Sequence, residues 1–262
     1  MTRVLQALKP DITWRFMHVW RRNLSVWLSF FEASLLANLG EPFLFLFAFG
    51  YGLGGYVKDI HGVPYIQFIA PGLLAASAMN SAAYECTFGA FTRMTIQKTY
   101  DAIISTPINL DEVVMGEIAW GTTKSLISGA AILAVLFAMG IVRSPLGIAA
   151  VIPIIIAGFL FSAMSILFTG LSPSYDFFSY YFTILIGPQF FFSGVFFPMD
   201  SMPDWIGTVA WFLPLTHCVN LVRPLFLGSL EAGMLLEAAW LLVFTAILVP
   251  FAIYAVKRRM IR

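Results

Sequence analysis

Charged side chains are scarce in this sequence. Asp, Glu, Lys and Arg make up 11% of its 262 residues, whereas 60% of the residues are hydrophobic and 16% are aromatic. A water-soluble domain carries about 25% charged residues, because polar atoms must cover much of its surface. A disordered chain is also excluded, since disorder goes with few aromatic residues and much charge. The composition therefore predicts an integral membrane protein.

Motifs for nucleotide binding and catalysis are also missing. The sequence has no GxxxxGKS or GxxxxGKT loop for phosphates, no HExxH metal motif and no GxSxG nucleophile motif. Its three histidines, His18, His61 and His217, are scattered along the chain, so we expect no metal site and no catalytic residue. The net charge of +1 gives no argument for nucleic acid as a partner. We expect neither enzyme activity nor a cofactor in this chain.

Six stretches are long and apolar enough to cross a membrane, because a bilayer core of about 30 Å needs about 20 apolar residues as helix. We predict an all-α membrane protein with spans at about 28–54, 66–91, 113–140, 146–170, 177–198 and 233–256. The region 202–228 is also apolar, but Pro203, Pro214 and Pro224 divide it into pieces too short to span. We interpret it as a re-entrant, extracytoplasmic hairpin of two half-helices.

The positive charges predict the orientation of these spans, because loops rich in Lys and Arg stay in the cytoplasm. Eleven of the 15 Lys and Arg residues lie in the N-terminal stretch, the loop after the second span and the C-terminal tail. Lys58, Arg143 and Arg223 lie on the other side. Both termini are therefore predicted to be cytoplasmic. Cys86 and Cys218 then lie on opposite sides, so no disulfide is expected.

Residues 1–27 are predicted to form a cytoplasmic helix that lies at the membrane surface. Its apolar face, at helical spacing, holds Trp14, Met17, Trp20, Leu24 and Trp27. Its other faces hold Arg15, Arg21, Arg22 and Asn23. Aromatic and cationic side chains together are typical of a helix at the level of the lipid headgroups. The alternative is a basic flank that only obeys the charge rule.

The cytoplasmic segment between the second and third spans has the pattern of a short helix. Residues 94–105 can form about three turns, which Pro107 stops because it disfavours helix at the residue before it. Asn109 is expected to cap the third span, with Asp111 and Glu112 in its first turn. The short helix would present Tyr100, Ile103 and Ile104 to a groove on a cytoplasmic partner; the alternative is a plain loop.

Some charged residues fall inside the predicted spans, where an unpaired charge costs several kcal/mol. Glu41 lies near the middle of the first span, and Lys124 lies near the middle of the third. Glu117 is seven residues before Lys124 and shares its helical face. One interpretation places Glu41 or Lys124 on a transport path. The other has these residues pair with each other or with a backbone carbonyl to hold helices together.

Several motifs together resemble those of a known transporter family. They include Tyr-Asp-Ala-Ile-Ile-Ser-Thr-Pro (100–107) with Asp-Glu-Val-Val-Met-Gly-Glu (111–117), and Gly-Glu-Ile-Ala-Trp-Gly-Thr-Thr-Lys (116–124). Others are the stretches 38–54, 188–200 and 212–224, which begin Asn-Leu-Gly-Glu-Pro-Phe, Pro-Gln-Phe-Phe-Phe-Ser-Gly and Phe-Leu-Pro-Leu-Thr-His. The chain resembles ABC-2-type exporter permeases nearly from end to end. It looks most like their nodulation-type branch, whose members export lipo-oligosaccharides.

This resemblance implies a dimer of six-span subunits above a dimer of separate ABC ATPase subunits, which bind the ATP and Mg. It implies a bacterial inner-membrane location and contact with membrane lipids. The segment 93–110 would be the coupling segment, with these residues at the coupling positions: Tyr100, Asp101, Ile103, Ile104, Thr106 and Pro107. Asp101 stands where relatives often have Glu, so its carboxylate reaches less far.

The fifth span of such exporters lines the pathway, where aromatic faces stack on sugars or contact acyl chains. The candidate rings here are Phe190, Phe191, Phe192, Phe196 and Phe197. We therefore predict the membrane subunit of an ATP-driven exporter of a lipid-linked or lipid-like saccharide. The alternatives are an exporter of hydrophobic drugs or natural products with the same fold, and an ATP-independent channel or secondary transporter.

Overall fold

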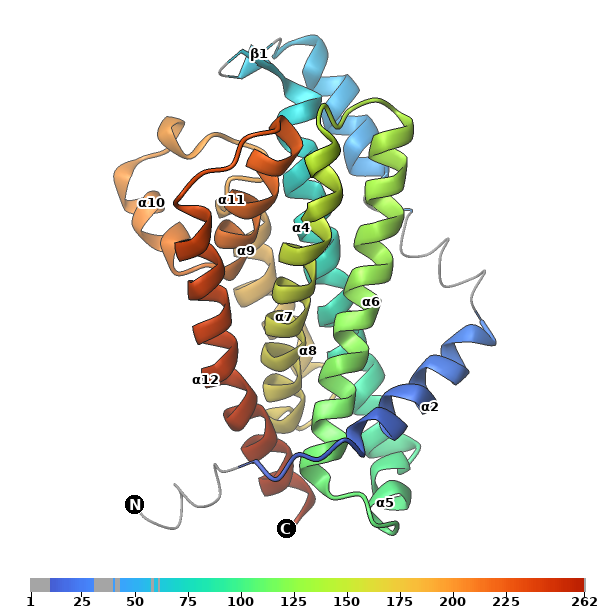
Figure 1. The fold of residues 1–262 in the computed structure, drawn as a ribbon. Helices are drawn as coiled ribbons and strands as arrows, with labels where there is room; N and C mark the ends of the chain where they lie inside the picture. The colour runs from blue at the N-terminus through green and yellow to red at the C-terminus, as the bar shows by residue number, and fades with distance from the viewer. Residues whose placement is uncertain (1–9, 31–39, 41–42, 58, 61, 262) are drawn as a thin grey trace.

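The computed structural model describes residues 10–30, 40, 43–57, 59–60 and 62–261. The described chain is a bundle of helices with one short antiparallel pair of strands, β1 (Asp59–Ile60) and β2 (Val63–Pro64). The short helix α5 (Thr99–Ile104) and the end of the C-terminal helix lie at one end of the bundle, and the strands lie at the other (Figure 1). We call these the α5 end and the β1 end.

Three helices are long and apolar enough to cross a membrane. They are α6 (Leu110–Ala138), α7 (Val151–Leu171), which a 3₁₀ turn (Pro145–Ala150) extends, and α12 (Met234–Met260). α7 packs between α6 and α12 (Figure 1). The predicted spans 113–140, 146–170 and 233–256 fall on these helices, which confirms them as helices of spanning length.

The predicted second span is part of a longer helix. α4 (Tyr65–Tyr84) continues through two π-helical segments, Glu85–Gly89 and Thr92–Ile96, so the chain is helical from Tyr65 to Ile96. The predicted short helix at 94–105 is therefore wrong at its start. Lys98 has a left-handed backbone (φ 53°), which ends the long helix, and only Thr99–Ile104 form α5.

The predicted fifth span is shorter than expected. A helix runs from Phe177 to Phe192 through α8 (Phe177–Tyr181), a π-helical segment (Phe182–Ile186) and α9 (Gly187–Phe192). The predicted end at residue 198 is wrong, because Gly194 has a φ of 72° and turns the chain back. By length and composition, the described residues contain three spans, or four if one bent helix pair counts. The six-span count stays a prediction.

That bent pair is α10 (Asp204–Trp211) and α11 (Pro214–Leu227), which meet at 94°. A 3₁₀ turn at Met199–Ser201 precedes α10. It falls within the region 202–228, where the prolines predicted two half-helices. The pair lies toward the β1 end (Figure 1). Its bend is the geometry of either a broken span or a re-entrant loop.

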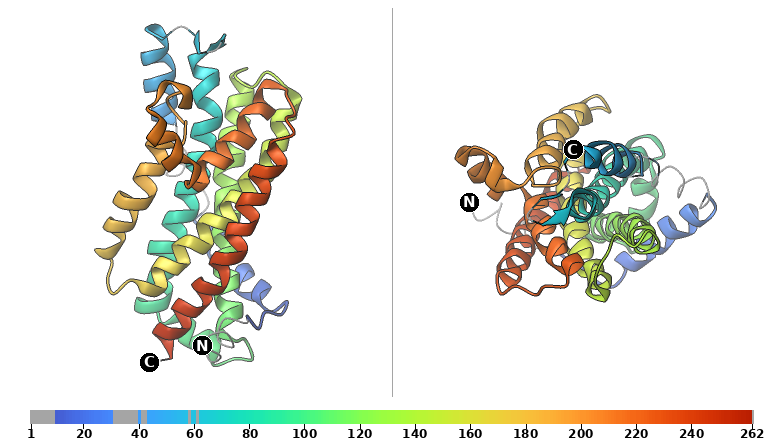
Figure 2. Two further views of the ribbon diagram at one scale, coloured as in Figure 1. Left: turned by 90° about the vertical axis from the view of Figure 1, so that its left-hand side faces the viewer. Right: turned by 90° about the horizontal axis from the view of Figure 1, so that it is seen from above.

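The N-terminal helix α2 (Phe16–Leu28) extends outward from the side of the bundle (Figure 2). Its start differs from the predicted range 1–27, of which residues 1–9 lie outside the described residues. The predicted orientation of its faces is also partly wrong. Val19 and Asn23 are buried against the bundle, whereas Trp14 and Met17 are exposed. The cause is a close crossing at Gly116 of α6, where a Cβ atom would lie 2.6 Å from that of Val19.

Residues 31–39 and 41–42 of the predicted first span, 28–54, lie outside the described residues, and so therefore does Glu41. From Phe43 the chain is helical again through a π-helical segment (Leu46–Gly52) and a 3₁₀ turn (Leu53–Gly55). The buried apolar side chains form two clusters. The larger cluster includes residues of α4, α11 and the part of α7 toward the β1 end, and the smaller cluster lies at the α5 end.

Candidate functional site

A buried ion network joins the helical segment that follows α4, residues 85–96, to α6 at the α5 end. Arg93 donates two parallel hydrogen bonds to Glu117, from Nε to Oε1 at 2.9 Å and from Nη2 to Oε2 at 2.5 Å. Its Nη1 also donates to Glu85 Oε1 at 2.9 Å. The Glu117 side chain is only 1% exposed. A planar guanidinium suits this bidentate geometry, so the network fixes both the distance and the rotation of the two helices.

The local backbone explains how Glu85 and Arg93 meet although they are eight residues apart. In a regular α-helix they would point about 80° apart, but the wider π turns reduce this angle. Gly89 lies between them and makes room for the pair. A Cβ atom there would lie 2.9 Å from Glu85 Oε1 and 3.3 Å from Arg93 Nη1. Burial alone would lower the pKa of Arg93, but Glu117 and Glu85 raise it, so the guanidinium stays charged.

Lys124, on the same helix as Glu117, has an aromatic neighbour. Glu117 pairs with Arg93, and the Lys124 ammonium instead lies 5.4 Å from the centre of the Trp27 ring. This cation–π contact ties α6 to α2, as does a hydrogen bond from Trp20 Nε1 to Thr123 Oγ1 at 2.8 Å. Its pairing with Glu41 lies outside the described residues. In the described part of the chain, Lys124 therefore holds helices together.

The predicted coupling residues divide into two groups. Tyr100 is 1% exposed and packs in the cluster at the α5 end, so its ring is not available to a partner. That placement corrects the prediction of a Tyr100–Ile103–Ile104 docking face. Asp101, Thr106 and Pro107 are exposed, Ile104 is 41% exposed, and Ile103 is partly buried. Burial raises the pKa of Tyr100 well above its usual value, and Glu117 adds to this effect.

The loop after α5 is held by both ends of the chain. The Asn109 cap is confirmed: its side chain accepts a hydrogen bond from the Glu112 N–H at 2.9 Å, and the Glu112 side chain bonds back. Arg15 Nη1 donates to Pro107 O at 2.7 Å. Lys257 of α12 forms an ion pair with Asp111 at 2.6 Å. These contacts connect the segment after α5 to the residue before α2, to α6 and to α12.

The predicted pathway rings do not share one helix face. Phe196 is buried, with its ring centre 4.8 Å from that of Phe49 and 5.0 Å from that of Phe190. Phe190 and Phe192 are partly buried, whereas Phe191 and Phe197 are more than 45% exposed. Only the last two are open to a passing molecule.

A second polar cluster, which the sequence did not indicate, lies toward the β1 end. His217 Nδ1 bonds to Glu237 of α12, and its Nε2 lies 2.7 Å from the backbone oxygen of Trp211. The ring also stacks on Trp240, with centres 4.0 Å apart. The cluster fastens the α10–α11 break to α12. Within the described ranges, no group of His, Cys, Asp and Glu side chains is arranged to hold a metal ion.

The fold and this site define a helical integral membrane protein, with a short exposed helix at one end that is firmly tied to the bundle. A family model described as "ABC-2 type transporter" matches residues 15–227. This chain therefore belongs to the ABC-2 type transporter family.

Its relatives include transport permeases. The chain is 38% identical to nodulation protein J of Rhizobium leguminosarum bv. trifolii, over 97% of both chains. It is 35% identical to nodulation protein J of Sinorhizobium fredii, again over 97% of both. It is 22% identical to the inner membrane transport permease YadH of Escherichia coli, over 86% of this chain and 88% of the relative. No solved structure is significantly similar to the chain.

Proposed function

We propose that this permease is the membrane subunit of an ATP-driven exporter, which works as a homodimer above a dimer of ABC ATPase subunits. The observation that carries the proposal is the surface of α5. Asp101 and Ile104 are exposed there, while Tyr100 of the same helix is anchored in the bundle. A helix with one face bound and one face open can pass a movement from a partner into the bundle.

The proposed location is a bacterial cytoplasmic membrane with the α5 end in the cytoplasm. The basic side chains at this end support that orientation: Arg15, Arg21, Arg22, Lys98, Lys257, Arg258 and Arg259. Both chain termini and α5 then face the cytoplasm, where ATP is available to the partner.

The proposed path of coupling runs from α5 to the bundle by two routes. Asp101, Ile104, Thr106 and Pro107 contact the ATPase, and Ile103 and Tyr100 join α5 to the bundle. One route follows the Asn109 loop into α6. The other returns through the helix before α5, where Arg93 binds Glu117. When ATP closes the ATPase dimer, both routes move α4 relative to its neighbours.

The proposed cargo is a lipid-linked or lipid-like saccharide, as the nodulation-type motifs imply. The exposed rings of Phe191 and Phe197 provide apolar faces for a sugar ring or an acyl chain at the dimer interface. The rings of Phe190 and Phe196 pack against that of Phe191.

Reconstitution in liposomes tests this function. The chain is purified with its cognate ABC ATPase and supplied with a fluorescent lipo-oligosaccharide. We expect outward movement of the probe that needs ATP and the ATPase, and stimulation of ATP hydrolysis by the probe. Transport by the chain alone would indicate an ATP-independent transporter. Stimulation by hydrophobic drugs and not by the glycolipid would indicate a drug exporter.

A further inference from the structure

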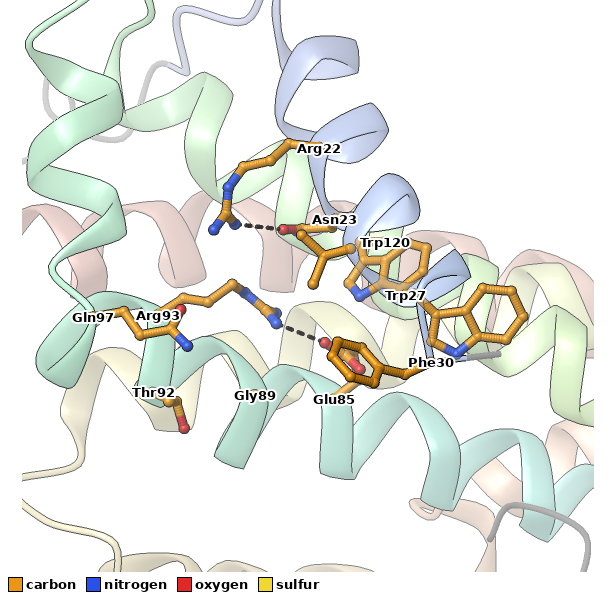
Figure 3. A pocket seen from close by; sticks show the side chains of 11 residues that line it. Arg22, Asn23, Trp27, Phe30, Glu85, Gly89, Thr92, Arg93, Gln97 and Trp120 are labelled. Carbon is orange, nitrogen blue, oxygen red and sulfur yellow. Dashed lines mark hydrogen bonds and ion pairs between the residues drawn. The ribbon is translucent and has the colours of Figure 1, made fainter. Parts of the chain in front are cut away.

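A cleft of about 310 Å³ opens between α2 and the helical segment 85–97 at the α5 end. Figure 3 shows its two walls, with Arg22 and Asn23 on α2 and with Glu85, Arg93 and Gln97 on the opposite segment. Apolar side chains line the rest: Val26, Trp27, Phe30 and Trp120. Of the lining residues, Arg93 belongs to the proposed coupling route, whereas Arg22 and Asn23 do not.

Asn23 positions the guanidinium of Arg22 on the α2 wall. Arg22 Nη1 donates to Asn23 Oδ1 at 2.9 Å, which holds the guanidinium beside the opening. Asn23 is only 4% exposed, and its buried Nδ2 has no hydrogen-bond partner in the described structure. A buried amide donor without a partner is costly, so Asn23 would gain a hydrogen bond if its side chain turned toward an acceptor in the cleft.

The two guanidinium groups of the cleft differ in their partners. Arg93 binds both Glu117 and Glu85 directly. Arg22 forms no direct ion pair with a carboxylate of the described residues, so its guanidinium is free to bind a phosphate at the opening. Burial and the nearby Arg93 lower the pKa of Arg22, Glu117 acts in the opposite direction, and an anion at the opening would also raise this pKa.

The opposite part of the cleft is apolar and reaches the surface. Val26 of α2 and Phe30, two residues after the end of α2, are exposed, and the Trp27 and Trp120 rings meet edge to face at 6.2 Å. The cleft thus has donors and a cation at one end and aromatic surface at the other. A phosphate with an attached acyl chain has the complementary pattern.

We propose that this cleft binds an anionic phospholipid, whose phosphate lies between Arg22 and Asn23 and whose first acyl segment follows Val26 and Phe30. The lipid is a resident ligand and not the cargo. It completes the α2 wall and links α2 to the helix that carries Arg93. The proposal does not depend on the identity of the transported molecule.

Lipid binding to the purified full-length chain tests the proposal. Native mass spectrometry counts bound phosphatidylglycerol during titration in detergent. We expect R22Q to weaken binding at least tenfold, because it removes a charged hydrogen-bond donor to the phosphate. R22K keeps the positive charge and loses the planar pair of guanidinium donors, so its affinity should lie between those of R22Q and the unchanged chain. N23L removes the unpaired donor and should also weaken binding.

The matched control is R21Q, which removes the same charge from the exposed neighbour of Arg22 on α2. R21Q should change binding less than twofold. Equal losses in R21Q and R22Q would show general surface attraction and overturn the proposal. Equal affinity for phosphatidylcholine would overturn it as well. Equal affinity for glycerol phosphate, which has no acyl chain, would show a free-phosphate site and not a lipid site.

Discussion

Arg93 donates two parallel hydrogen bonds to Glu117, which lies 24 residues later in the sequence. The contact joins the π-helical segment Thr92–Ile96, which follows α4 and precedes α5, to α6. It is buried, and the second carboxylate, Glu85, leaves the local group with an excess of negative charge. Such a group costs desolvation energy, so its value lies in fixing one arrangement of the two helices.

Removal of one partner from this network should destabilise the bundle. Glu117→Leu would leave the buried Arg93 with only Glu85, and loss of a partner in a buried ion pair costs about 3–5 kcal/mol. The double variant Arg93→Met with Glu117→Leu should recover part of that loss, because no unpaired guanidinium remains. Denaturant unfolding in mixed micelles measures both. Lys98→Met, at an exposed cation of the same region, is the control and should change stability little. A double variant no more stable than Glu117→Leu would contradict this account of the pair.

Gly89 is predicted to tolerate no side chain. Alanine there would bring Cβ within 2.9 Å of Glu85 Oε1, so the ion pair or the π turn must shift. We expect a loss of about 1–3 kcal/mol in unfolding free energy, typical of overpacking. Gly207→Ala in α10 is the matched control, since no atom lies within 4 Å of its added methyl group. That control should be neutral or stabilising by up to about 1 kcal/mol. Equal effects of the two substitutions would remove the role assigned to Gly89.

Local rules predicted the helix boundaries that local residues determine. Asn109 and Glu112 form the capping box that starts α6, and the prolines of 202–228 coincide with the bent helix pair. Rules of this kind act within a few residues. They could not place Gly194, whose positive φ turns the chain after α9, because the preceding phenylalanines continue a helical pattern. They also could not show the π turns, which depend on contacts with other helices.

The candidate site was less accessible to sequence reasoning. Glu117 and Lys124 share a face of α6, but spacing on one helix says nothing of the partners that other helices supply. The partner of Glu117 is Arg93, and Lys124 lies at Trp27. The sequence predicts that Tyr100 faces a partner protein, because spacing on a short helix does not show whether an apolar side chain faces the bundle or the outside. The tertiary structure turns it inward.

The α5 surface offers a direct test of coupling. Ile104→Asp places a charge at a position that is 41% exposed, so the fold should tolerate it. We expect at least a tenfold weaker association with the ABC ATPase, measured by pull-down from membranes, and a matching loss of ATP-dependent transport. Leu230→Asp is the control at the opposite end, where the side chain is 73% exposed. Normal ATPase association in Ile104→Asp would exclude Ile104 from the docking face.

Tyr100 of the same helix should behave differently. Tyr100→Ala should lower the free energy of unfolding by about 3–5 kcal/mol, because the ring is buried.

The His217 contacts should control the mobility of the α10–α11 pair. One ring nitrogen, Nδ1, bonds to Glu237 of α12, and the other, Nε2, lies 2.7 Å from the Trp211 carbonyl oxygen at the end of α10. His217→Phe keeps stacking on Trp240 and loses both bonds. We expect faster amide exchange in residues 204–217, by hydrogen exchange with mass spectrometry, and a loss of about 1–3 kcal/mol. His18→Phe, at an exposed histidine of α2, is the control. Unchanged exchange in His217→Phe would show that packing alone holds the pair.

Substitution should divide the five predicted pathway rings into those that stabilise the fold and those that contact the cargo. Phe196→Ala removes a ring from the buried cluster with Phe49 and should cost about 3–5 kcal/mol. Phe191→Ala and Phe197→Ala remove exposed rings and should cost much less, since their surface is already open. If the exposed rings contact the cargo, both variants should fold normally and lose glycolipid-stimulated ATPase activity. Basal ATPase activity in the same complexes is the internal control. Normal stimulation in the double variant would move the transport pathway away from this face.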